Sequence, residues 1–234
     1  MADISSQALI DKFQYALDND WGYIWGTAGV LWTAAKQAAA TREQTVKYGK
    51  KWINHYVADC SGLFSWAFKQ LGGFMFHGSN TMWDQYCTAK GELKKGKRAD
   101  GQDLKPGTAV FTYNKDTGKR GHVGLYIGND SVIEASSTQT GVIKSKITNT
   151  KWVEWGELKG VKYDGGDVPV PEGYAVVTGK RVALRKDPST KANIIMRIDT
   201  GKQVKLEVPP PSEWDYVEYQ GKKGYMMKEF LKEG

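Results

Sequence analysis

The chain has 234 residues, of which 33 are basic and 26 acidic, so its formal net charge at neutral pH is +7. Hydrophobic residues make up 40% of the chain and aromatic residues 12%, a composition that excludes a disordered protein and allows one or two cores. The two cysteines cannot form a disulfide framework, and the modest positive charge suits an anionic partner without naming one.

The N-terminal residues do not have the pattern of a secretory signal. They carry neither a basic stretch nor an apolar segment after it. The longest uncharged run, residues 21–35, is too short to span a membrane and contains three glycines. We therefore expect a protein that is made in the cytoplasm without a signal peptide and does not insert into membranes.

Three helices are expected in the first third of the chain. Apolar residues spaced by three and four after Ser5 predict a capped helix that ends near Asn19. The alanine-rich residues 34–48 predict a second helix by propensity. A third helix is expected over residues 60–71, where Gly72 and the glycine after it should end it.

From Lys105 onward the periodicity changes to two, which is typical of strands. Gly128, Asn129 and Asp130 predict a tight hairpin turn. The expected strands are Thr108–Tyr113, His122–Ile127, Ser131–Ser136 and Gly141–Ile147. Helices followed by a meander of strands indicate an α+β fold, with an antiparallel sheet after the helices.

Composition divides the chain into two domains. Residues 1–163 form the first domain, and residues 164–173 are rich in Gly, Pro and Asp and are expected to be a linker. Residues 174–234 contain short strand-like runs separated by turn signals, without a good helix. That pattern predicts a small all-β barrel.

Cys60 has the sequence context of a reactive thiol. It lies in Asp59-Cys60-Ser61-Gly62, where the third helix is expected to begin. The positive end of a helix dipole and the unpaired N–H groups there predict a lowered thiol pKa, and the same groups could hold a developing oxyanion. Cys87 has no such context and is expected to be a small buried hydrophobic residue.

A thiol nucleophile needs a histidine and a third group that orients the imidazole. His122 opens a predicted strand between two glycines, and Glu134 lies twelve residues later across the expected hairpin. Their even separation allows both side chains on one face of the sheet, with Tyr126 near the level of Glu134. The remaining histidines, His55 and His77, have no partners at metal-ligand spacing.

These residues fall within a set of motifs that resembles the NlpC family of papain-like bacterial cell-wall cysteine peptidases. The motifs are Tyr23-Ile24-Trp25-Gly26, Asp59-Cys60-Ser61-Gly62-Leu63, Leu104-Lys105-Pro106-Gly107, His122-Val123-Gly124-Leu125-Tyr126-Ile127-Gly128 and Val132-Ile133-Glu134-Ala135. The resemblance implies a papain-like fold in which Cys60 is the nucleophile and His122 the general base and acid. Glu134 stands at the orienting position, where many members have a histidine.

The resemblance also implies a substrate. In relatives that trim free stem peptides, residues matching Tyr23, Asp59 and Ser61 recognise a free L-alanine amine, and we assign Trp25 to substrate binding with them. This points to cleavage of the bond between γ-D-glutamate and the diamino acid. The segment between the first two motifs, residues 27–58, is longer than is usual in the family, so it should form an insert near the mouth of the active site.

The C-terminal region resembles bacterial SH3-like wall-binding domains. The matching pieces are Val182–Ser189, Gly201–Val204, Trp214–Val217 and Gly224–Met226. The resemblance implies that peptidoglycan is the partner of this domain as well as the substrate of the first. We expect a monomer that binds no nucleic acid, metal ion or nucleotide cofactor.

The leading hypothesis is a peptidoglycan hydrolase, specifically a phage or prophage endolysin that reaches the wall after release by a separate pore or by lysis. Two alternatives within enzymes are an N-acetylmuramoyl-L-alanine amidase and a cytoplasmic peptidase that recycles muropeptides. An alternative of another class is a wall-binding or phage-structural protein without catalytic activity.

Overall fold

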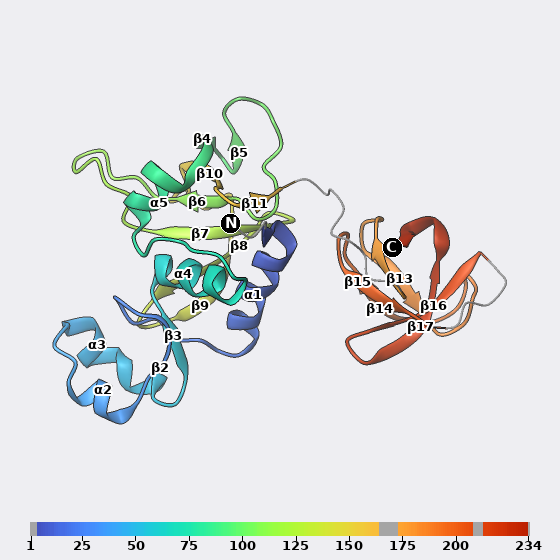
Figure 1. Cartoon of the computed structure of the whole chain (residues 1–234), viewed down its shortest axis with the longest axis horizontal. Helices are drawn as coiled ribbons and strands as arrows, with labels where there is room; N and C mark the ends of the chain where they lie inside the picture. The colour runs from blue at the N-terminus through green and yellow to red at the C-terminus, as the bar shows by residue number, and fades with distance from the viewer. Residues whose placement is uncertain (1–3, 164–172, 208–212, 234) are drawn as a thin grey trace. The chain divides into compact units, whose positions relative to one another are not determined.

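The computed structural model describes residues 4–163, 173–207 and 213–233 (Figure 1). The chain divides into two compact units, Met1–Tyr163 and Asp164–Gly234. The expected linker, residues 164–173, lies outside the described residues except for Gly173. Within the described ranges, no helix combines the length and the apolar composition that crossing a bilayer requires.

Two helices form the helical layer of the first unit, and both begin and end where the sequence predicts. Helix α1 (Ser6–Asp18) starts at the N-cap Ser5, whose side chain accepts a hydrogen bond from the N–H of Ala8. Helix α4 (Cys60–Gln70) ends at Gly72, which has φ +74° and lets the next N–H bond back to Phe68. Their apolar faces pack against each other and against the sheet.

The sheet of the first unit is a curled antiparallel sheet of seven strands in the order β5-β4-β10-β6-β7-β8-β9. Its strands, in chain order, are β4 (Cys87–Lys94), β5 (Lys97–Arg98), β6 (Ala109–Phe111), β7 (Val123–Gly128), β8 (Ser131–Ser137), β9 (Gly141–Lys146) and β10 (Glu154–Leu158). The four predicted strands correspond to β6 to β9. Strands β4, β5 and β10 extend the sheet beyond that meander, and helix α5 (Ser79–Tyr86) precedes β4.

The β7–β8 hairpin turns at Asn129 and Asp130, which both have positive φ as the sequence predicts. Its register pairs Leu125 with Ile133 and Tyr126 with Val132. The prediction that Tyr126 lies level with Glu134 is therefore wrong by two residues, because the register shifts at an irregularity between Tyr126 and Gly128.

Apolar side chains cover both faces of this sheet. The larger cluster joins α1 and α4 to one face through residues such as Phe13, Phe64 and Leu125. A smaller cluster on the other face contains Val132 and Trp152. A two-stranded parallel sheet of β1 (Ile4–Ser5) and β11 (Val161–Lys162) joins the two ends of the unit.

The insert, residues 27–58, forms a small subdomain with its own core. It consists of β2 (Ala28–Leu31), α2 (Ala34–Ala38), α3 (Glu43–Tyr48), the 3-10 turn η1 (Gly49–Trp52) and β3 (Tyr56–Ala58). The single helix predicted over residues 34–48 is wrong, because Gln37 accepts a hydrogen bond from the indole of Trp32 and donates one to the carbonyl of Thr45. These bonds fold the segment into two short helices around Trp32.

Trp52 fastens the insert to the sheet. Its indole N–H donates to the carbonyl of Thr138 over 2.6 Å, just beyond β8. A Cβ atom on Gly22 or Gly141 would overlap the Trp52 ring, so both glycines are required for this close contact. The insert is thus held against the turn between β8 and β9.

The described residues of the second unit form strands and one 3-10 turn, η2 (Lys228–Phe230). Its antiparallel sheet has the order β14-β13-β17-β16-β15-β12-β18. The strands are β12 (Tyr174–Val177), β13 (Val182–Arg185), β14 (Ile194–Ile198), β15 (Gln203–Leu206), β16 (Trp214–Tyr219), β17 (Lys222–Met227) and β18 (Leu231–Glu233). A core that includes Val177, Leu184 and Val217 fills it. The SH3-like assignment stays a prediction.

Candidate active site

Cys60 is the first residue of α4, and its side chain is buried. Asp59 caps the helix by accepting the N–H of Gly62 at 2.8 Å. The backbone carbonyl of the same aspartate accepts the N–H of Leu63, so the N–H groups of Cys60 and Ser61 remain at the helix end. These two groups favour a negative charge on the sulfur, as the sequence predicts.

The thiol pKa differs from the prediction. Burial, followed by the negative charge of Asp59, raises the pKa of Cys60 to about 11, although hydrogen bonds from N–H groups of Val123, Ser61 and Cys60 favour the thiolate. The sequence analysis counted the helix end and overlooked the cost of burying the charge. Removal of the thiol proton therefore needs a base.

The hydrogen bond from the Val123 N–H to Cys60 shows that the start of β7 lies beside the sulfur. His122 directly precedes Val123, and its Nε2 lies 2.6 Å from Oε2 of Glu134. This leaves Nδ1 as the ring nitrogen available to the thiol. The structure thus brings His122, just before β7, together with Glu134 of β8, and places the backbone N–H of the next residue, Val123, against Cys60.

Glu134 is completely buried and ionised. Burial alone would favour its neutral form, but hydrogen bonds from His122 and Lys151 lower its pKa to about 2. Its carboxylate is therefore a permanent negative charge next to the imidazole. The hydrogen bond between this carboxylate and Nε2 fixes the orientation of the ring.

A cavity of about 480 Å³ opens beside the sulfur, and we call it the nucleophile cavity. All four residues assigned to substrate binding line it, together with Cys60 and with Gly121, which precedes His122. The four are Tyr23, Trp25, Asp59 and Ser61. Burial and the nearby charges of Cys60 and Asp59 raise the pKa of Tyr23, so its phenol stays protonated and can donate a hydrogen bond.

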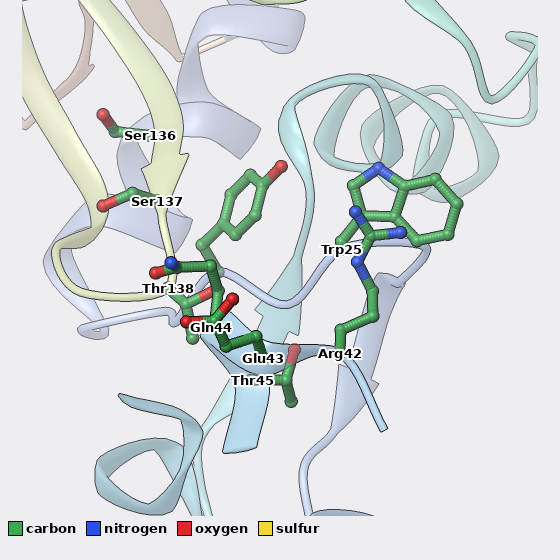
Figure 2. A pocket seen from close by; sticks show the side chains of 9 residues that line it. Trp25, Arg42, Glu43, Gln44, Thr45, Ser136, Ser137 and Thr138 are labelled. Atoms are coloured by element: carbon green, nitrogen blue, oxygen red, sulfur yellow. The ribbon is translucent and has the colours of Figure 1, made fainter. Parts of the chain in front are cut away.

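A second cavity of about 570 Å³ shares Tyr23 and Trp25 with the first, so the two meet at these side chains. Figure 2 shows it between residues 42–45 of the insert and residues 136–138 at the end of β8. The Arg42 guanidinium lies 3.9 Å from the centre of the Trp25 ring. The insert therefore forms a wall of the groove that leads to Cys60.

Four residues of the site carry no sequence signal that would have found them. Lys151 holds the Glu134 carboxylate, and the ring of Trp152 stacks on His122 with 5.6 Å between centroids. Arg42 covers Trp25. His77, which the sequence analysis left without a partner, binds Asp59. Each contact joins segments whose approach depends on the tertiary fold, so no spacing rule predicts it.

The described residues contain no group of three His, Cys, Asp or Glu side chains arranged to hold a metal ion. The arrangement present is a cysteine at a helix N-terminus against the start of β7, a histidine that directly precedes this strand, and a carboxylate on the adjacent strand that binds the histidine. These are the three kinds of group that a papain-like cysteine hydrolase uses.

Comparison with known proteins agrees with this class. The model of the NlpC/P60 family matches residues 41–157, half of the chain, so the chain belongs to the NlpC/P60 family. The comparison with curated proteins finds no match.

Three solved structures illustrate the proteins to which this chain is similar in fold. NlpC2 from Trichomonas vaginalis is 18% identical with a TM-score of 0.44, over 64% of this chain and 47% of its own, so this chain spans less than half of that protein. The peptidoglycan hydrolase RipB from Mycobacterium tuberculosis is 22% identical with a TM-score of 0.39, over 67% and 68%. RipD from the same organism, described as a non-catalytic peptidoglycan-binding protein, is 19% identical with a TM-score of 0.41, over 65% and 95%.

Proposed function

We propose that this chain is a peptidoglycan hydrolase that cuts the stem peptide, at the bond between γ-D-glutamate and the diamino acid. The observation that carries the proposal is the buried Glu134 carboxylate bound to His122, on a strand that begins against the sulfur of Cys60. A buried, ionised carboxylate is costly to place in a protein core unless its charge is used or paired. Here it is paired with Lys151 and with His122, the residue before the Val123 N–H that bonds to the cysteine sulfur.

The reaction begins with transfer of the thiol proton to Nδ1 of His122. The sulfur attacks the γ-carbonyl carbon of the glutamyl residue, and the N–H groups of Cys60 and Ser61 stabilise the oxyanion that forms. His122 then gives its proton to the leaving amine of the diamino acid, which breaks the amide bond. A water molecule, deprotonated by the same imidazole, hydrolyses the thioester and restores the thiol.

The second unit is proposed to hold the enzyme on its substrate as an SH3-like wall-binding domain. Tyr216 and Tyr225 pack against each other with 4.8 Å between ring centroids and remain partly exposed, so they offer an aromatic surface to a peptide or sugar. Trp214 is buried and belongs to the interior. In this proposal the protein is a monomeric phage or prophage endolysin that acts on the wall after release from the cytoplasm.

Purified cell walls test the proposal. The wild-type protein should clear a wall suspension, whereas Cys60→Ala should lose this activity. Cys87→Ala is the matched control, because Cys87 lies in β4 against Gly156 and outside the nucleophile cavity. This variant should clear walls at the wild-type rate.

The products identify the bond. Mass spectrometry should find a new amino group on the diamino acid. A free lactyl carboxyl group on muramic acid would indicate the amidase instead, and cleavage of free stem peptides without clearing of walls would indicate a recycling peptidase. Clearing by Cys60→Ala at the wild-type rate would overturn the thiol mechanism, and binding of walls by the wild-type protein without any cleavage would indicate a non-catalytic role.

A further inference from the structure

Asp59 is the one carboxylate among the described residues that line the nucleophile cavity. Its side chain is 7% exposed and its oxygens already accept several hydrogen bonds. Oδ2 accepts the N–H of Gly26 at 2.7 Å, while Oδ1 accepts the N–H of Gly62 at 2.8 Å and the hydroxyl of Ser61 at 3.2 Å. These three donors belong to the framework of the site.

His77 is the remaining donor to Asp59. Its Nε2 lies 2.8 Å from both carboxylate oxygens, and its side chain is one-third exposed in the cavity. A carboxylate has about four lone-pair positions, so the four donors together saturate it. The hydrogen bond to Asp59 also raises the pKa of His77, so the imidazole carries positive charge over a wider pH range.

This arrangement determines which end of a peptide the cavity can hold. A free ammonium group that enters loses its hydration and needs a negative partner, but the only carboxylate there is occupied by another cationic or hydrogen-bond-donating group. An acylated nitrogen carries no charge and needs only a hydrogen-bond acceptor. His77 therefore disfavours binding of a peptide with a charged amino end and does not affect one whose amino end is acylated.

We propose that His77 is a specificity-determining residue that occupies Asp59, so that the cavity accepts stem peptides with an acylated amino end and discriminates against those with a free amine. The inference rests on the proposed function and deepens it. A stem that is still attached to muramic acid has its alanine nitrogen acylated. The enzyme would thus act on intact wall and not on released stem peptide.

Two synthetic peptides test this inference, L-Ala-γ-D-Glu-L-diamino acid with a free and with an acetylated amino end. Their dissociation constants are measured by calorimetry on full-length Cys60→Ala protein, which does not turn them over. We expect the acetylated peptide to bind at least tenfold more tightly. In the double variant Cys60→Ala, His77→Ala, the preference for the acetylated peptide should fall by about tenfold. The reason is that the free amine can then form an ion pair with Asp59.

Two further variants test whether the effect depends on the hydrogen bond between His77 and Asp59. His77→Gln retains an N–H donor for Asp59 and should keep the original ratio. His55→Ala removes a histidine that lies outside the cavity and should also keep it. Equal binding of both peptides by the His77-containing protein, or a ratio that His77→Ala leaves unchanged, would overturn the inference.

The same peptides separate this inference from the proposed function. Because binding is measured without turnover, it gives an answer even if the wild-type protein cleaves neither peptide. Cleavage of both peptides at equal kcat/KM by wild type would support the hydrolase and reject the role of His77. Selective binding without cleavage by wild type would support the role of His77 and reject the hydrolase.

Discussion

Nζ of Lys151 lies 2.7 Å and 2.5 Å from the two oxygens of Glu134, so the buried carboxylate is held by a lysine as well as by His122. The lysine follows β9, and the carboxylate lies in β8. An ammonium group and an imidazole nitrogen thus converge on one anion. This relationship explains how the charge of Glu134 persists inside the protein, and it leads to the first two predictions.

Glu134→Gln should lower kcat on a stem-peptide substrate by roughly 10- to 1000-fold, because the neutral amide does not stabilise protonated His122. The shape of the site is kept, so KM should change little. Lys151→Met is the comparison variant, since it leaves the carboxylate and its bond to His122 in place. Its kcat should fall less than that of Glu134→Gln. A Glu134→Gln enzyme with wild-type kcat would show that the carboxylate has no orienting role.

Acid should lower the free energy of unfolding of the first unit, because Glu134 is then protonated. Its pKa is about 2 in the folded protein and about 4.5 for the ordinary side chain, so the folded state binds its proton less readily. The resulting stability is complete above about pH 4.5 and is lost as the pH falls toward 2. We expect wild type to lose about 3 kcal/mol more unfolding free energy than Glu134→Gln over this interval.

Urea titrations between pH 5 and 2, followed by tryptophan fluorescence, measure this difference. The control is the same comparison over pH values above 5, where the slope of stability with pH should be similar in both proteins. Parallel loss of stability in the two proteins down to pH 2 would argue that other carboxylates control the acid transition.

Gly62→Ala should be strongly destabilising. A Cβ atom there would lie 2.0 Å from the backbone oxygen of Thr27, so the start of α4 and the entry to the insert must separate. We expect a loss of about 3 kcal/mol or more in the free energy of unfolding, seen as a lower Tm. Gly121→Ala is matched to it, because no atom lies within 4 Å of its Cβ position, and it should melt like wild type.

Trp52→Phe should loosen the insert without unfolding the unit. The substitution leaves the carbonyl of Thr138 without its buried N–H donor, which costs about 1–3 kcal/mol. Amide hydrogen exchange should increase over residues 34–52 while α4 stays protected. Val46→Ala, at a half-exposed position of the same insert, should leave exchange unchanged, and an identical effect of both variants would remove the special role of Trp52.

The thiols should react slowly with iodoacetamide at neutral pH. The pKa of Cys60 is about 11 and that of Cys87 about 12, in both cases chiefly because of burial. The alkylation rate of Cys60, measured by peptide mass spectrometry, should rise about tenfold per pH unit below 11. Cys60 should react faster than Cys87, because it lines a cavity. A rate of Cys60 that levels off near pH 7 would instead indicate a thiolate already paired with His122.

The parts of the fold that local sequence controls were predictable. The cap at Ser5, the glycine end of α4 and the turn at Asn129 and Asp130 each depend on a few neighbouring residues, and all three are confirmed. Cys60, His122 and Glu134 could be chosen because a helix start and a two-residue alternation place them. The parity of His122 and Glu134 was right even though the register differs by two residues.

The other features depend on contacts between distant segments. The alanine-rich segment divides into α2 and α3, and Gln37 of α2 bonds to Trp32 and to the carbonyl of Thr45 in α3; propensity contains no information about these partners. Asp59 and His77 are eighteen residues apart across the end of α4, with no periodic relation. The prediction of a lowered thiol pKa was wrong for a similar reason, since the burial of Cys60 depends on the sheet that packs on it.

The hydrogen bond between Trp52 and Thr138 connects the insert, which forms a wall of the groove, to the strand that carries Glu134. Thr138 lies four residues after Glu134 along β8 and its continuation, a distance of about 13 Å in an extended chain. A change in the insert that displaces Trp52 is therefore expected to shift the end of β8 as well as the width of the groove.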